Sequence, residues 1–284
     1  MVNECMQETW ATSGRGWVEN ETMFDQVFTP FTHALLGAAA IEPGDRVLDV
    51  GCGSGTLLEH ATRLGATAVG VDISEAMVAA AQRRVPGATV RLADAQTADL
   101  TPDSGQAFNR VVSRFGVMFF EDPSAAFANI RRSIAAGGRL TFVCWRSDDD
   151  PLMFTLGTSV LTDRLGGSGA VADPAAPGPL AFADADRVRE ILTDAGWDDI
   201  GIEPVDGMCD YGIDGSDGVE ERLAMVLSTT TGQRARAALE PSLGLDGWAA
   251  LVDDVRAEIR RHTVDGVVKF IGRTWLVTAG NPST

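Results

Sequence analysis

Short apolar runs and amphipathic stretches alternate along the first half of the chain. Runs typical of buried strands lie at residues 46–50, 66–72, 88–95, 108–116 and 139–145. Patterns typical of helices lie at residues 56–64, 74–85 and 124–138. Strands and helices that alternate at this spacing form βαβ units with right-handed crossovers. The pattern therefore predicts an α/β fold with a doubly wound, Rossmann-like, mostly parallel sheet that helices cover on both faces.

Helical additions surround this predicted core. Residues 20–40 have an apolar repeat close to 3.6 residues with a break at Pro30, and Trp10 and Trp17 precede that helix in a polar segment. Later patterns indicate helices at 152–165, 184–197, 218–230 and 246–262, and strands at 198–205 and 266–279. We expect one domain over residues 1–284.

Three segments of that domain are expected to enclose a substrate. They are a helical cap at residues 1–40 and two insertions at residues 147–183 and 206–262. The first insertion contains a connector rich in glycine and proline, a composition typical of a loop. The helices of the second insertion are a candidate interface for a homo-oligomer.

Composition narrows the choice of partners. The chain has 284 residues, 45% of them apolar, and a formal net charge of −17. This charge repels phosphate backbones and anionic membranes, so we expect a small-molecule partner, no nucleic acid and no membrane insertion. The four cysteines are scattered without a CxxC pair, which favours a reducing, cytoplasmic setting and no metal. No targeting segment is expected.

A glycine-rich turn between the strand at 46–50 and the following helix carries the main chemical signal. Gly51, Gly53 and Gly55 allow the backbone to approach a ligand closely, beside the free N–H groups of a helix N-terminus. A dinucleotide motif would have a further glycine where Thr56 stands. Asp49, before the glycines, would repel a pyrophosphate and favours a ligand with a cationic amino group.

The residues from Asp49 to Gly55 resemble motif I of the class I S-adenosylmethionine-dependent methyltransferases. Asp72 and Asp94 follow the next two strands, at positions that match the acidic residues of that family. The resemblance covers roughly residues 45–146. It also includes the stretches SRFGVMFF and AAGGRLTFVCW, and it implies a seven-stranded sheet. More narrowly, it points to the ubiquinone/menaquinone-type or small-molecule branch of bacteria.

The resemblance implies a site for S-adenosyl-L-methionine, with S-adenosyl-L-homocysteine as product. Asp72 is expected to accept hydrogen bonds from the ribose hydroxyls and Asp94 from the adenine amine. The predicted cofactor-binding residues are Trp17, Asp49, Gly51, Gly53, Gly55, Asp72, Ile73, Met77, Asp94, Ala95, Gln96, Ser113, Arg114 and Phe115.

Two of these positions allow alternative interpretations. Arg114 either contacts the cofactor carboxylate or pairs with a surface acid. Trp17 either closes over the cofactor or anchors the N-terminal segment on the core.

The acceptor pocket is expected to be apolar, lined by Phe24, Phe28, Met118 and Met153. Phe115 and Met118 belong to a dense apolar run, and such runs more often form core than a substrate pocket. His33 and His262 are the candidate general bases, because histidine titrates near neutral pH. Surface or helix-terminal roles are the alternative for both.

The predicted activity is transfer of the cofactor's methyl group to a small organic acceptor by in-line displacement. Such an enzyme has to align acceptor and methyl carbon and exclude water, and it needs a base only for an acceptor with a high pKa. One alternative is an enzyme of the same fold that binds the cofactor but catalyses a cyclisation or rearrangement. An NAD-dependent reductase and a non-enzymatic binding protein are further alternatives.

Overall fold

The computed structural model describes residues 3–102, 105–146, 151–167 and 175–283. Part of the predicted first insertion, at residues 147–150 and 168–174, therefore lies outside the described residues. The helices are α1 (Glu4–Glu19), α2 (Glu21–Val27), α3 (Thr29–Ala39), α4 (Thr56–Arg63), α5 (Glu75–Arg84), η1 (Val117–Phe119), α6 (Pro123–Arg132), α7 (Leu152–Thr155), α8 (Thr158–Arg164), α9 (Ala185–Asp194), η2 (Ile213–Gly215), α10 (Val219–Ser228) and α11 (Thr230–Arg261). The strands are β1 (Arg46–Val50), β2 (Thr67–Asp72), β3 (Thr89–Leu92), β4 (Phe108–Arg114), β5 (Ile134–Trp145), β6 (Asp198–Asp210), β7 (Thr263–Val264) and β8 (Val267–Gly280).

The strands form one mixed sheet in the order β3-β2-β1-β4-β5-β8-β6, with the short β7 paired to β8. The five strands from β3 to β5 are parallel, and β8 runs antiparallel to both of its neighbours β5 and β6. Consecutive buried positions in β1 are typical of a strand covered on both faces. The predicted doubly wound, mostly parallel sheet of seven strands is confirmed.

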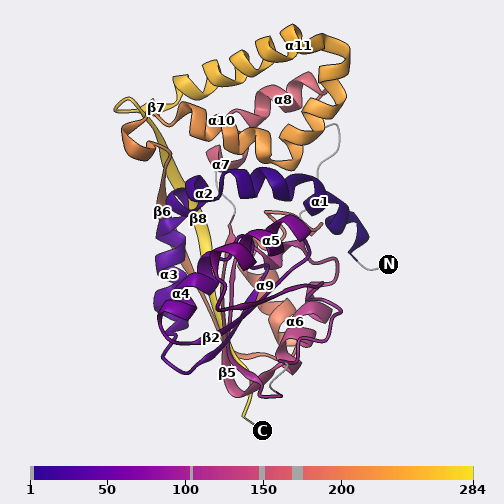
Figure 1. Cartoon of the computed structure of the whole chain (residues 1–284), viewed down its shortest axis with the longest axis vertical. Coiled ribbons are helices and arrows are strands. Elements are labelled where there is room, and N and C mark those ends of the chain that lie inside the picture. The colour runs from indigo at the N-terminus through magenta and orange to yellow at the C-terminus, as the bar shows by residue number, and fades with distance from the viewer. Residues whose placement is uncertain (1–2, 103–104, 147–150, 168–174, 284) are drawn as a thin grey trace.

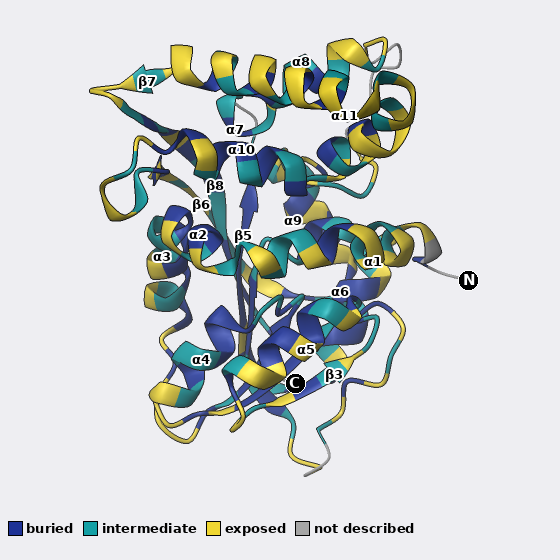
Figure 2. Cartoon of the chain, turned by 45° about the horizontal axis from the view of Figure 1, so that its top comes forward, coloured by how far each residue is buried: buried dark blue, intermediate teal, exposed yellow. Residues whose placement is uncertain are grey.

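Helices cover the sheet and extend beyond it (Figure 1). Helix α4 packs against β1 and β2, α5 against β2 and β3, and α6 and α9 pack together beside β5 and β6. Above the sheet, α8 and α10 both pack on α11, and the long strands β6 and β8 reach up to these helices. Helix α1 lies between these upper helices and α5. Figure 2 shows buried residues along the sheet and exposed residues on the outer faces of α1 and α11.

Several predicted boundaries are wrong. The helix predicted at 124–138 ends at Arg132, because Ile134 already pairs with Phe108 as the first residue of β5. The polar segment that contains Trp10 and Trp17 is helix α1, which packs against α5, α10 and α11. The strand predicted at 198–205 continues to Asp210 in partnership with β8. In each case contacts with distant parts of the chain determine the boundary.

The predicted helices also divide differently. The break expected at Pro30 falls at Phe28, where α2 ends and α3 begins, and Pro30 occupies the first turn of α3. The helix predicted at 246–262 is the second part of α11, which starts at Thr230 and is kinked at Gly244. The helix predicted at 152–165 is split into α7 and α8 at Gly157.

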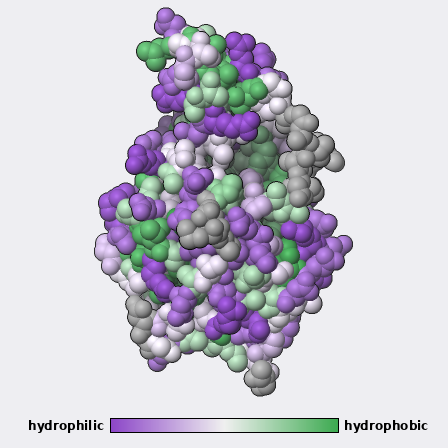
Figure 3. Space-filling view, turned by 90° about the vertical axis from the view of Figure 1, so that its right-hand side faces the viewer, coloured by the Kyte–Doolittle hydropathy of each residue, from purple (hydrophilic) through white to green (hydrophobic). Residues whose placement is uncertain are grey.

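On the face shown in Figure 3, hydrophilic and hydrophobic residues alternate over the upper helices, and an apolar recess lies beneath them. Among the described residues, no helix is both long enough and apolar enough to cross a bilayer.

Arg222 joins the upper helices to the strands through a buried network. Its guanidinium is 1% exposed and donates hydrogen bonds to the carbonyls of Leu152, Met153 and Leu156 and to the Tyr211 hydroxyl. The cation also lies 5.5 Å from the centre of the Tyr211 ring. This one side chain therefore holds α7 and α10 against β6.

We predict that Arg222→Met lowers the free energy of unfolding by about 3 kcal/mol, because three carbonyls and a hydroxyl lose a buried donor. Urea unfolding measures the change. The control is Arg256→Met, which removes a partly exposed arginine paired with Glu220 and should cost below about 1 kcal/mol. Equal losses in the two variants would contradict the proposed role of the network.

Candidate active site

A cavity of about 250 Å³ opens at the carboxyl ends of the parallel strands. Val50, Asp72 and Arg114, the last residues of β1, β2 and β4, line it. The opposite wall comes from α1, α2 and the upper helices, through residues such as Trp17 and Met225. Ligands of open α/β sheets bind at this edge, so the fold itself favours a binding site here.

The glycine turn between β1 and α4 forms the floor of the cavity. Gly51 and Gly53 have φ angles of +65° and +53° and line the cavity. A Cβ atom on Gly51 would lie 2.8 Å from the Cα atom of Gly116, so the two turns pack backbone against backbone. Gly55 has a φ of +93° and lies against Ala81 of α5 rather than in the cavity. At Gly51 and Gly53 the turn therefore presents backbone rather than a side chain to a ligand.

On the floor of the cavity, the carboxylate of Asp49 lacks hydrogen-bond partners. Its side chain is 1% exposed, lines the cavity, and has no hydrogen-bond partner for either carboxylate oxygen. Burial raises the pKa of Asp49 to about 8, because the positive charge of Arg114 only partly offsets the loss of water. The nearby carboxylate of Asp72 adds to the rise. A buried carboxylate without a partner is a ready receptor for a cation.

Asp72 and Asp94 are already held by hydrogen bonds. The carboxylate of Asp72 accepts from the backbone N–H groups of Gly53 and Ser74, both at 2.9 Å. Burial raises the pKa of Asp72, and these N–H groups oppose the rise. Both carboxylate oxygens of Asp94 accept from the side-chain amide of Asn3, at 2.9 Å each. Asp94 is thus arranged to receive an NH₂ group.

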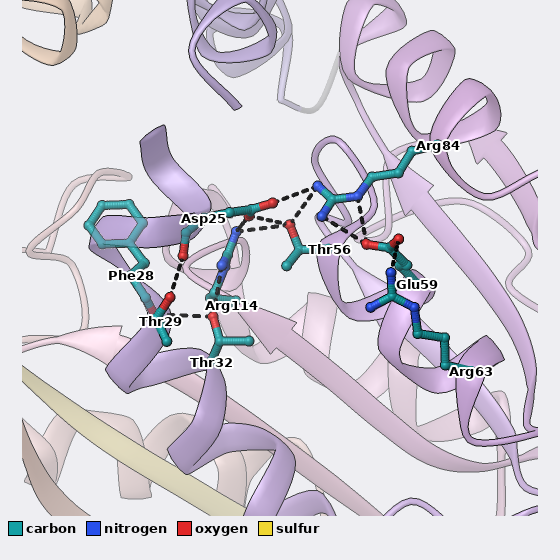
Figure 4. A network of polar contacts seen from close by, with 9 residues as sticks. All are labelled: Asp25, Phe28, Thr29, Thr32, Thr56, Glu59, Arg63, Arg84 and Arg114. Atoms are coloured by element: carbon teal, nitrogen blue, oxygen red, sulfur yellow. Dashed lines mark hydrogen bonds and ion pairs between the residues drawn. The ribbon is translucent and has the colours of Figure 1, made fainter. Parts of the chain in front are cut away.

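Arg114 is the centre of an ionic network behind the glycine turn (Figure 4). Its guanidinium donates to Asp25, Thr32 and Thr56, and Asp25 also pairs with Arg84 at 2.6 Å. Burial alone would raise the pKa of Asp25, but Arg114, Thr56 and Arg84 outweigh it and lower that pKa. The arginine therefore pairs with an internal acid, a partner that neither sequence interpretation named.

Aromatic side chains dominate the rest of the lining. Trp17 and Phe24 stack with ring centres 3.8 Å apart, and Phe115 and Trp145 stack at 4.3 Å. Phe115 has a φ of +62°, a conformation that costs free energy in a non-glycine residue and is typical of functional sites. Such walls suit an apolar or flat molecule.

The cavity brings together most of the predicted site residues. Those that line it are Trp17, Phe24, Phe28, Asp49, Gly51, Gly53, Asp72, Ile73, Met77, Asp94, Ala95, Arg114, Phe115, Met118 and Met153. Gln96 and Ser113 lie just behind it: Gln96 accepts from the Asp122 N–H, and Ser113 donates to the Val50 carbonyl. The roles assigned to these residues stay predictions.

The two predicted bases lie elsewhere. His33 lines a separate polar pocket with His60, Glu59 and Arg84. His262 caps the end of α11, with its Nδ1 atom 3.1 Å from the Glu258 carbonyl. Within the described residues, no group of three or more His, Cys, Asp or Glu side chains is placed to hold a metal ion.

Sequence reasoning missed three polar residues of the site. Asn3 bonds to Asp94, Asp25 bonds to Arg114, and Glu21 lines the cavity with its Oε2 atom buried and unpaired. Glu21 and Asp25 are four residues apart in the helix predicted at 20–40, so its periodicity places these two on one face. No comparable signal marked Asn3.

Comparison with known proteins agrees with this geometry. Residues 48–142 match the family model of a methyltransferase domain. A protein of Mycobacterium tuberculosis described as uncharacterised is 34% identical over 125 residues, which cover 43% of this chain and 45% of that protein. The demethylmenaquinone methyltransferase of Renibacterium salmoninarum is 27% identical over 183 residues, or 61% of this chain and 75% of the relative. The chain thus spans less than half the length of the mycobacterial relative it matches.

A solved structure extends the likeness in fold beyond the matched region. The [4+2]-cyclase SpnF superimposes with a TM-score of 0.52 and 20% identity, covering 89% of this chain and 81% of that one. The fold, the glycine turn and the acidic residues that follow the strands agree with the family match. Residues 48–142 thus belong to a methyltransferase domain of the class I, S-adenosylmethionine-dependent type, with distant homology to demethylmenaquinone methyltransferases.

The raised pKa of Asp49 predicts a specific pH dependence of stability. Between about pH 4 and pH 8 the folded chain keeps a proton on Asp49 that the unfolded chain releases. The free energy of unfolding should therefore fall as the pH rises through this window, by up to about 1.4 kcal/mol per unit from this group.

Asp49→Asn should remove that contribution, since asparagine does not titrate. Urea unfolding at pH 5, 6, 7 and 8 measures both proteins. The variant should gain stability relative to the wild type as the pH rises. A stability difference that stays constant across the range would contradict the raised pKa.

Proposed function

We propose that the chain binds S-adenosylmethionine in the aromatic-walled cavity and transfers its methyl group to a small organic acceptor by in-line displacement. The unpaired carboxylate of Asp49 at the glycine turn is the observation that carries this proposal. When bound, the cofactor supplies a methyl group on a sulfonium, which is already activated for transfer.

The residues present fit this cofactor. Asp49 offers a carboxylate to its ammonium group, and Asp72 keeps lone pairs for the ribose hydroxyls beside the two N–H groups it accepts. Asp94 already accepts from the NH₂ group of Asn3, which is the same kind of donor as the adenine amine. Gly51 and Gly53 add no side chains to the floor, so a ligand can approach their backbone closely.

The aromatic walls fit the acceptor. Phe24, Phe28, Met118 and Met153 line the cavity, and all four are buried. They would hold an apolar molecule and exclude water, which helps to align the acceptor with the methyl carbon. The relatives named as demethylmenaquinone methyltransferases support a small-molecule acceptor.

The arrangement of the whole chain supports two further parts of the proposal. One domain over residues 1–284 is favoured because β6 and β8, from the second half of the chain, complete the sheet that β1 to β5 begin. A reducing, cytoplasmic setting is favoured by the free state of the cysteines, among them the buried Cys52, Cys144 and Cys209.

Calorimetric titration with S-adenosylhomocysteine tests the cofactor site. The wild type should bind, and Asp72→Ala should bind at least about tenfold more weakly, because a charged hydrogen-bond acceptor is lost. The control is Glu75→Ala, an exposed acid at the start of α5 that does not line the cavity. A folded wild type that gives no binding heat would refute the proposed function.

Release of S-adenosylhomocysteine tests the transfer itself. The protein is incubated with methyl-labelled S-adenosylmethionine and pools of small hydroxylated and aminated organic molecules. We expect label in one acceptor and an equal amount of S-adenosylhomocysteine. Cofactor binding without release of S-adenosylhomocysteine in any pool would favour the alternative, a cyclisation or rearrangement. The similar fold of the [4+2]-cyclase SpnF is the reason to test this alternative.

A further inference from the structure

Two carboxylates that line the cavity keep buried oxygen atoms without a hydrogen-bond partner. Among the described residues, these are both oxygens of Asp49 and the Oε2 atom of Glu21. The other acids of the lining are engaged. Asp25 pairs with Arg84 and Arg114, while Asp72 and Asp94 accept from N–H groups.

Glu21 belongs to the aromatic wall rather than to the glycine turn. It is the first residue of α2, and Trp17, Glu21, Phe24 and Phe28 follow one another at spacings of three and four residues. Trp17 belongs to α1, Glu21 and Phe24 to α2, and Phe28 directly follows α2, and all four line the cavity. The ring of Trp17 stacks on that of Phe24, and both rings line the cavity that Glu21 also lines.

The two unpaired carboxylates suit two different ligands. The polar groups of the cofactor are matched by Asp49, Asp72 and Asp94, which leaves the Glu21 oxygen without a partner from that source. A buried acceptor atom without a donor costs free energy, and a bound molecule that supplies the donor recovers it. The surroundings of Glu21 also specify that molecule, because aromatic walls bind aromatic rings.

We propose that Glu21 determines acceptor specificity, by accepting a hydrogen bond from a hydroxyl or amino group of an aromatic acceptor. This inference rests on the proposed function. The same carboxylate repels acceptors that carry an anionic group, and a methylated product that has lost its donor leaves the site more readily. Glu21 also lines the neighbouring polar pocket, where Thr22 and Gln26 are exposed, so its carboxylate lies between the aromatic cavity and solvent.

The test measures binding of three naphthalene probes to the complex with S-adenosylhomocysteine, by calorimetry at pH 7. The probes are 2-naphthol, which has a donor, 2-methoxynaphthalene, which has none, and 2-naphthoate, which is an anion. The wild type should bind 2-naphthol about tenfold more tightly than 2-methoxynaphthalene, as expected for a hydrogen bond to a charged group. It should bind 2-naphthoate most weakly.

Two variants separate the role of Glu21 from a structural one. Glu21→Leu should bind 2-naphthol and 2-methoxynaphthalene equally. Glu21→Gln, which keeps the shape and a carbonyl acceptor, should keep a reduced preference for 2-naphthol and lose the discrimination against 2-naphthoate. Glu19→Leu and Glu19→Gln are the matched controls, since Glu19 is exposed and does not line the cavity, and they should behave as the wild type.

The outcomes distinguish this inference from the proposed function. Wild-type protein that binds S-adenosylhomocysteine but no naphthalene probe, or that binds 2-naphthol and 2-methoxynaphthalene alike, overturns the role of Glu21 alone. So does a tenfold loss of S-adenosylhomocysteine affinity in Glu21→Gln, which would assign the residue to the cofactor. Wild-type protein that binds no S-adenosylhomocysteine overturns the proposed function and this inference together.

Discussion

The burial of Asp49 without a partner is the constraint on which the site depends. A carboxylate at the end of β1, closed off from water, keeps its proton up to a pH of about 8. The fold tolerates it because the proton removes the charge, and because Arg114 stands near enough to reduce the cost of ionisation. A core built for stability alone would place an apolar residue here. The chain instead retains a group whose charge Arg114 stabilises only in part.

The elements around Asp49 enclose the cavity from two sides. On one side, Gly51 and Gly116 pack backbone to backbone, and Ser113 ties β4 to β1 through the Val50 carbonyl. On the other side, α1 and α2 bring aromatic rings and Glu21 over the cavity. The ionic network of Arg114 and Asp25 joins the two sides, because Asp25 belongs to α2 and Arg114 to β4. This ion pair thus joins the α2 side of the cavity to the carboxyl end of β4.

Much of the fold and of the cofactor side followed from local sequence patterns. The strands β1, β2 and β4 are apolar runs with a charged residue at or next to their last position, namely Asp49, Asp72 and Arg114. The glycine turn was recognisable because its glycines alternate with other residues. The acceptor side was harder to predict, because its walls come from segments far apart in the chain. Nothing local indicated that Asn3 would reach Asp94, or that Arg222 would hold α7 and α10 against β6. His33 and His262 were chosen for their titration near neutral pH, and the fold places neither in the cavity.

The central claim is that the buried carboxylate of Asp49 receives the ammonium group of the cofactor, and proton release on binding tests it most directly. S-Adenosylhomocysteine is titrated at pH 7 into the protein in buffers of different ionisation enthalpy. Because the free carboxyl with a pKa of about 8 is mostly protonated at pH 7, pairing with a cation should release close to one proton. Asp49→Asn should release none. Wild-type binding without proton release would contradict the account.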